Sequence, residues 1–213
     1  MRKITAILIF SLAGAALPAL AQSWEIGGAA GGGFYTSQQV TSPSGNANAT
    51  IATGLSASAW LGNDSGRLFG GEVRYDFGNG DLKLSSGGTN VQFSAQTHAI
   101  HYDFLMHFAP RGARIRPFIA AGAGIKLYEG TGQQQVYQPL ENIAILTATN
   151  DTVPLVSVGA GVKIAVTPSM MIRVDIHDYL SPFPNQVIAP ATGAKESGWL
   201  QDFVPAVGVA FTF

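Results

Sequence analysis

The chain has 213 residues, of which 46% are hydrophobic and only 12% are charged. Ordinary soluble domains carry about 25% charged residues, so this composition argues against a soluble enzyme and suits a β-barrel with one face in lipid. The formal net charge of −1 gives no indication of a nucleic-acid partner, and the absence of cysteine excludes disulfides, thiolate metal sites and cysteine nucleophiles.

The start of the chain has the parts of a secretory signal peptide. Two basic residues, Arg2 and Lys3, precede an apolar stretch over residues 4–20 that ends at a small-residue site, Ala19-Leu20-Ala21. We therefore expect a removable signal peptide over 1–21 and a mature domain over 22–213. The alternative, a membrane-anchor helix, is less favoured because the cleavage site directly follows the apolar run.

Eight later stretches alternate apolar residues with small or polar ones, at the period of two that is typical of β-strands. In chain order they cover residues 24–35, 51–61, 68–77, 100–108, 116–127, 156–166, 172–177 and 203–213. Phe93 breaks the alternation just before the fourth stretch, so we expect either a bulge or emergence from the membrane there. Bacterial outer-membrane barrels of one chain contain an even number of strands.

The segments between these strands alternate in length. Long segments cover residues 38–48, 78–90, 131–151 and 184–198, and short turns cover 62–67, 109–113 and 167–169. Outer-membrane barrels have this pattern, with short periplasmic turns and longer extracellular loops. The predicted fold is therefore all-β: an eight-stranded antiparallel up-and-down transmembrane β-barrel. Within the longest loop, the apolar run 143–146 is expected to be a strand extension above the membrane or a recognition patch.

The two faces of the predicted strands differ in chemistry. One face is apolar, with aromatic residues near the strand ends, and the other carries Gly, Ala, Ser and scattered charges. Small residues fit the narrow interior of an eight-stranded barrel, so we assign the apolar face to lipid. The alternative is a soluble, lipocalin-like carrier with its apolar face inside. We predict that the charges of the lumen form an ionic network that plugs the barrel; they are Glu25, Glu72, Arg74, Asp76, Asp103, Arg116, Lys126, Lys163, Arg173 and Asp175.

Two groups of residues are candidates for a site of chemistry. His101, Asp103, Asp175 and His177 fall on lumen faces and could hold a metal or transfer protons, but no tight ligand spacing accompanies them. Ser94 and His98 share a strand face but lie about 13 Å apart, beyond hydrogen-bond reach. We therefore predict no catalytic residue, no metal and no cofactor.

Several segments resemble the OmpA-like outer membrane β-barrel domain family. They are the Gly-rich run 27–33, the stretches 116–124 and 173–179, and the terminal run 207–213. The resemblance covers nearly the whole mature chain and implies the barrel fold. It also implies that the alternating terminal residues Val207, Val209, Phe211 and Phe213 are the signal read by the outer-membrane assembly machinery. The peptidoglycan-binding domain of larger relatives has no counterpart here, so a direct wall-tethering role is not expected.

Together these observations predict a structural protein of the bacterial outer membrane rather than an enzyme. We expect it to contribute to envelope integrity or surface interaction through its long extracellular loops, where an extracellular ligand could bind. The alternatives are a narrow pore and a lipid-modifying enzyme. The expected partners are outer-membrane lipids and lipopolysaccharide, the assembly machinery and periplasmic chaperones, with no nucleic acid.

Overall fold

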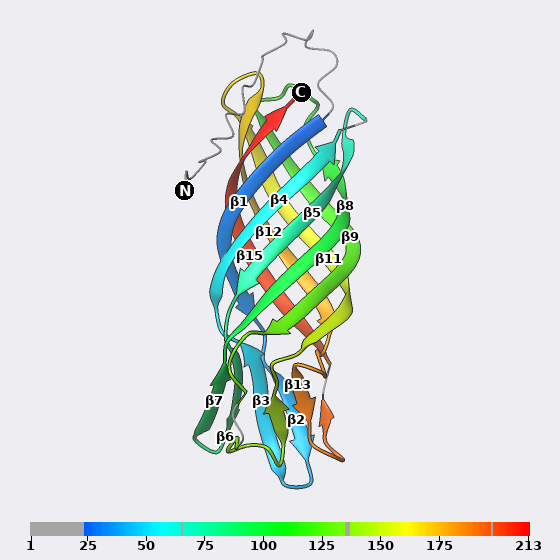
Figure 1. Cartoon of the computed structure of the whole chain (residues 1–213). Helices are drawn as coiled ribbons and strands as arrows, with labels where there is room; N and C mark the ends of the chain where they lie inside the picture. Colours follow the sequence, from blue (N-terminus) through cyan, green and yellow to red (C-terminus); the bar gives the residue numbers. More distant parts are fainter. Residues whose placement is uncertain (1–23, 65, 135–136, 197) are drawn as a thin grey trace, which may run out of the picture.

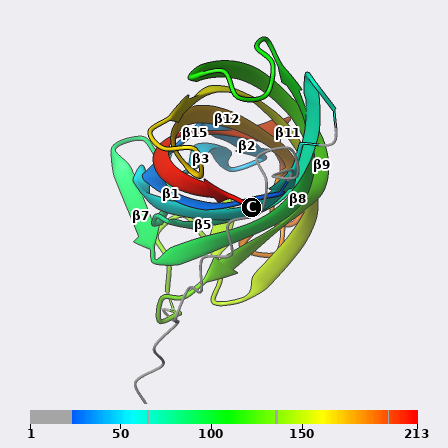
Figure 2. The same cartoon turned by 90° about the horizontal axis from the view of Figure 1, so that it is seen from above.

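Eight strands close into an antiparallel barrel in the computed structural model, which describes residues 24–64, 66–134, 137–196 and 198–213. Going round the barrel, the strands are β1 (Trp24–Tyr35), β15 (Trp199–Thr212), β12 (Met170–Pro182), β11 (Asn150–Ala165), β9 (Ile115–Gly130), β8 (Ala95–His107), β5 (Phe69–Asn79) and β4 (Gly54–Asn63). Strand β4 pairs with β1 and so closes the ring (Figures 1 and 2). The predicted eight-stranded fold is confirmed. The signal peptide predicted over 1–21 lies outside the described residues.

The alternation along each strand sorts side chains between the outside of the barrel and its lumen. In β8, Ile100, Tyr102 and Phe104 are each about half exposed on the outer face, whereas His101 and Asp103 are buried inside. Exposed large apolar residues lie on the outside of all eight barrel strands. The barrel is therefore apolar outside and charged inside, as predicted, which is the reverse of a soluble carrier. No helix within the described residues has the length and hydropathy needed to cross a bilayer.

Small residues allow neighbouring strands to pack around a narrow lumen. A Cβ atom placed on Gly122 would collide with the carbonyl oxygen of Tyr102 and with the Asp103 side chain. A Cβ atom on Gly161 would meet the side chains of Asp175 and Phe118. The glycines of the lumen face thus leave space for the larger side chains that fill it.

Seven shorter strands lie beyond the end of the barrel opposite the chain's C-terminus (Figure 1). One sheet has the order β14 (Lys195–Glu196), β2 (Gln38–Ser42), β3 (Gly45–Ile51), β6 (Leu82–Ser86) and β7 (Thr89–Phe93), and a second sheet pairs β10 (Ala144–Leu146) with β13 (Ile188–Pro190). We call these strands and the segments that join them the cap. The segments predicted as long loops thus contain strands.

The cap has an apolar core of its own. Val40, Leu82, Leu84 and Leu146 are fully buried within it, on three different strands. The same cluster includes side chains from the barrel strands, namely Tyr128, Val153 and Leu200. The cap is therefore packed onto the end of the barrel and continues its interior.

Two predictions in this region need correction, and one of the two expectations for Phe93 is confirmed. Ile51 was assigned to the second barrel strand, but it ends β3 and is buried in the cap. The run 143–146 is neither a barrel-strand extension nor a surface patch, because β10 pairs with β13 and Ile143, Ala144 and Leu146 are buried. Phe93 ends β7 and packs in the cap core, so it breaks the alternation because the chain has left the barrel there.

Candidate functional site

The centre of the lumen contains ion pairs between strands on opposite sides of the barrel. Arg173 on β12 donates to both oxygens of Glu72 on β5, at 2.5 and 2.8 Å, and to Asp175 at 2.6 Å. Arg74 on β5 donates to Asp76 and to Asp175, each at 3.1 Å. Three strands separate β5 from β12 in either direction round the ring. The Arg173–Glu72 and Arg74–Asp175 pairs therefore cross the full lumen, whereas the other two pairs each lie along one strand.

Further charges join this centre from β1 and β11. The Lys163 ammonium donates to Glu25 at 2.6 Å, and the indole nitrogen of Trp60 donates to the same carboxylate at 2.7 Å. The guanidinium of Arg173 lies 4.6 Å from the ring centres of both Trp60 and Phe118. The two aromatic rings thus flank the Arg173 cation and exclude water from it. Glu25 links β1 to β11 through its hydrogen bond with Lys163.

Two histidines extend the network on its β8 and β12 sides. The ring nitrogens of His101 lie 3.0 Å from Asp103 and 3.0 Å from Asp76. His177 Nε2 lies 3.4 Å from Asp103 Oδ2, without the geometry of a hydrogen bond. We call this set the lumen network; its members are Glu25, Glu72, Arg74, Asp76, His101, Asp103, Lys163, Arg173, Asp175 and His177.

Two other ion pairs lie apart from the lumen network. Lys126 donates to Asp202 at 2.8 Å and lies 5.1 Å from the ring centres of Tyr35 and Tyr128. At the end with the short turns, Arg116 pairs with Asp64, which follows β4. Burial raises the pKa of the Asp64 carboxyl, but the positive charges of Lys163 and Arg116 lower it by more, so the pKa lies below its usual value.

The structure therefore brings together eight of the ten residues that the sequence singled out. The other two, Arg116 and Lys126, stand in separate pairs whose partners, Asp64 and Asp202, the sequence reasoning missed. It also missed the lumen aromatics Trp60, Phe118, Tyr128 and Tyr179. The alternation could have indicated most of these residues, because each aromatic has the same odd or even position as the lumen residues of its own strand. Asp202 also has the position of a lumen residue, because β15 begins at Trp199, before the predicted start of that strand.

Burial decides what this arrangement can do. None of the ten predicted side chains is more than 8% exposed. A charge held away from water costs several kcal/mol unless it is paired. Nine of the ten have an oppositely charged partner. Asp103 lies 3.0 Å from the ring of His101, which is charged only when it is protonated. The arrangement can thus fill the lumen and tie opposite walls together.

One group of residues inside the network could approach a metal ion. Glu72, Asp103 and His177 each offer a ligand atom, and these atoms lie within 4.8 Å of one another. Both Glu72 oxygens already accept hydrogen bonds from Arg173, and Arg74 is 3.9 Å away. Two neighbouring guanidinium groups repel a further cation, so the group fits ion pairing better than metal binding.

Ser94 and His98, the candidate catalytic pair, do not contact each other. His98 Nδ1 lies 2.7 Å from the Tyr75 hydroxyl, and its Nε2 is 3.8 Å from Glu129. The carbonyl of Ser94 accepts hydrogen bonds from the backbone of Thr131 and Gly132. His98 is therefore oriented by Tyr75 and Glu129 rather than by Ser94.

Comparison with known proteins agrees with this architecture. A family model described as outer membrane protein beta-barrel domain matches residues 6–196. Among solved structures, Neisserial surface protein A aligns over 89% of this chain and 97% of its own, with a TM-score of 0.55 and 13% identity. The outer membrane protein OprG from Pseudomonas aeruginosa aligns over 90% and 97%, with a TM-score of 0.60 and 7% identity. No curated protein matches the sequence.

Proposed function

Because the chain belongs to the outer membrane protein beta-barrel domain family, and so resides in the bacterial outer membrane, we propose that it is a plugged barrel that presents its cap at the cell surface. The family membership confirms the resemblance noted in the sequence. The short turns of such barrels lie at their periplasmic end, which supports an extracellular position for the cap. The proposed role is structural, with the cap as the surface for interaction.

The observation that carries this proposal is the set of ion pairs that cross the lumen between β5 and β12. An eight-stranded barrel is just wide enough for its interior to be filled by side chains. Here Arg74, Arg173 and their carboxylates fill it from both walls, and the core of the cap continues above. Moving ions through would require these pairs to separate in a low-dielectric interior, which is costly.

Conductance in planar bilayers tests the closed state. We expect no sustained unitary current steps from the purified full chain at moderate voltage. Regular steps that scale with salt concentration would contradict the plug and favour the rival function of a narrow pore. A specific observation supports that rival: the His177 ring nitrogens and one Asp175 oxygen are buried without a hydrogen-bond partner within the described residues. Such atoms usually bind water.

Assembly in the membrane is the second part of the proposal. Val207, Val209 and Phe211 project from the outer face of β15, and Phe213 exchanges backbone hydrogen bonds with Trp24. We propose that these four residues are the signal read by the assembly machinery, after delivery by periplasmic chaperones. Lipids and lipopolysaccharide would then cover the apolar outer face. Changing Phe213→Ala should reduce the amount of protein in the outer membrane, and an unchanged yield would contradict this role.

A further inference from the structure

The outward face of the larger cap sheet is rich in uncharged hydrogen-bonding side chains. Strands β2, β3 and β6 alternate between the buried core and this face, so that Val40, Ala47, Ala49 and Leu84 point inward while their neighbours point outward. One row across four strands consists of Gln39, Asn48, Ser85 and Asn90. This row carries no charge, whereas the next row on the same face includes Lys83.

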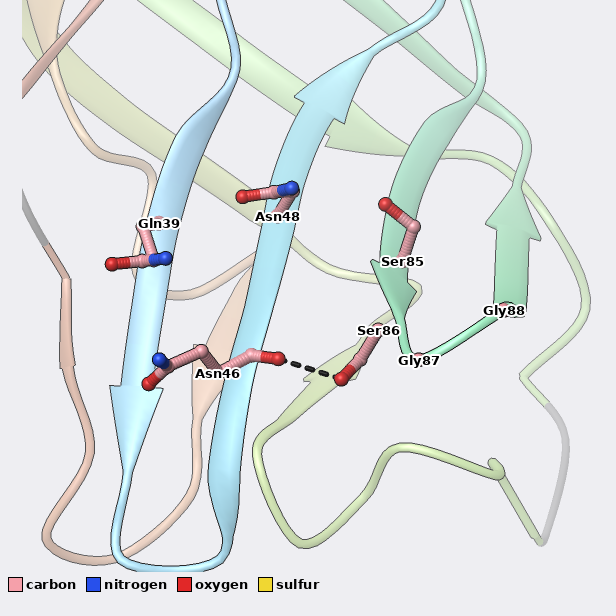
Figure 3. A pocket seen from close by; sticks show the side chains of 7 residues that line it. All are labelled: Gln39, Asn46, Asn48, Ser85, Ser86, Gly87 and Gly88. Carbon is pink, nitrogen blue, oxygen red and sulfur yellow. Dashed lines mark hydrogen bonds between the residues drawn. The ribbon is translucent and has the colours of Figure 1, made fainter.

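This face is hollowed next to that row. The hollow has a volume of about 240 Å³ and is lined by Gln39, Asn46, Asn48, Ser85, Ser86, Gly87 and Gly88 (Figure 3). The side chains of Asn46, Asn48 and Ser85 have no hydrogen-bond partner among the described residues. Their donors and acceptors are therefore free to bind a ligand in place of water.

The floor and the rim of the hollow are held in place by the fold. The hydroxyl of Ser86 donates to the Asn46 carbonyl at 2.6 Å and so links the β6–β7 hairpin to β3. Gly87 and Gly88 form the two-residue turn of that hairpin with positive φ values of 55° and 88°, which glycine adopts without strain. Open space surrounds both Cα atoms, so a ligand can approach the backbone there.

From these observations we infer that the hollow binds one unit of an uncharged saccharide chain. Sugar hydroxyls both donate and accept hydrogen bonds, and the amides and hydroxyls of the lining do the same. No charged residue lines the hollow, so it offers no opposite charge to a phosphate or sulfate group. Pockets that enclose small molecules usually measure about 300–1,000 Å³, so this smaller hollow suits one ring of a longer chain.

The inference rests on the proposed function, because it requires the cap to lie on the outside of the cell. It adds the class of molecule that the cap would contact. Two sources of such a saccharide exist at a bacterial surface. One is the cell's own surface polysaccharide, which would make the protein a tether within the envelope. The other is the glycan of another cell, which would make it an attachment protein. The hydrogen-bonding chemistry is the same for both.

The test measures binding by the full chain in lipid nanodiscs. One arm uses the delipidated surface polysaccharide of the producing bacterium, and the other uses a panel of uncharged polysaccharides (dextran, mannan and galactan). We expect binding in at least one arm, with little change between low and high salt because no ions are displaced. The arm that binds identifies the source.

Matched variants locate the site. Asn48→Ala removes one amide from the hollow and should weaken binding about fivefold, the loss expected for one or two hydrogen bonds. Asn142→Ala makes the same change at an exposed position of the cap outside the hollow and should leave binding unchanged. Both variants should keep the wild-type gel mobility of an unheated sample, which shows that the barrel is closed.

Three outcomes would overturn the inference: no binding in either arm, binding that high salt abolishes, or equal affinity of Asn48→Ala and wild type. Each of these results is distinct from failure of the proposed function, which would show itself as channel activity in the bilayer measurement.

Discussion

Arg173 is the most heavily engaged cation of the lumen network. It holds Glu72 through two hydrogen bonds and Asp175 through a third, and it is buried between two aromatic rings. Removing one partner from a buried ion pair leaves the other charge unpaired, which costs about 3–5 kcal/mol. We therefore expect Arg173→Ala to lower the free energy of unfolding by about that amount, measured by urea titration in lipid vesicles.

The control for this change is Arg67→Ala, which removes an exposed arginine from the turn between β4 and β5. It should unfold within about 0.5 kcal/mol of the wild type, as surface substitutions usually do. If Arg173→Ala and Arg67→Ala unfolded at the same urea concentration, the lumen network would not stabilise the barrel.

The Asp64–Arg116 pair predicts a pH dependence. The pKa of Asp64 lies below its usual value in the folded protein, so the unfolded chain binds the proton more tightly. The stabilisation is present above the ordinary aspartate pKa of about 4 and is lost as the pH falls through the depressed folded value. We expect Asp64→Asn to reduce the loss of stability on acidification below about pH 4, measured as urea midpoints along a pH series. An identical pH profile for variant and wild type would contradict this pairing.

At the scale of strands, alternation alone predicts the barrel. Each barrel strand must satisfy two environments at once, lipid outside and packed charge inside, so its residues follow a strict period of two. Trp60 shows how far the rule extends. It is a large aromatic residue, yet it shares the parity of Ser56 and Ser58 and lies in the lumen beside Glu25. Residue type alone would have assigned it to lipid.

The cap could not be predicted in the same way. Its strands are two to seven residues long, and its core is built from segments far apart in the chain, such as β3 with β6 and β10 with β13. Ile51 illustrates the difficulty. It has the same odd-numbered position as the apolar residues of the next barrel strand, but it pairs with Leu82 in the cap sheet. The alternation along such short segments does not show which distant segment each one pairs with.

The core of the cap makes a prediction at the same scale. Leu84 is fully buried among cap residues, and Leu55 is 75% exposed on the outside of the barrel. Leu84→Ala should destabilise the cap by about 2–5 kcal/mol through the cavity it leaves. Limited proteolysis of the protein in vesicles should then cut the cap faster while the barrel stays protected.

Leu55→Ala is the matched control for this prediction, because it removes the same atoms from a side chain without protein packing around it. Its proteolysis should follow that of the wild type. If Leu84→Ala were cut no faster than Leu55→Ala, the cap would not depend on its apolar core.

At the scale of the whole molecule, the ring is closed by pairing between β1 and both β4 and β15. A closed barrel has no free strand edge, so detergent cannot unzip it from one side. We expect the unheated protein to migrate differently from the heated protein in SDS gels. Identical mobility before and after heating would contradict a closed barrel.

The charges of the lumen also bear on how correctly the chain is inserted. A slip of one residue in any strand turns its inward side chains outward. For β12 such a slip would move Arg173, Asp175 and His177 into lipid, where a cation near the midplane costs about 2–4 kcal/mol. The barrel thus carries a check on its own alignment: a slip of one residue in β12 would leave the charges of β5 without their partners and turn those of β12 toward lipid.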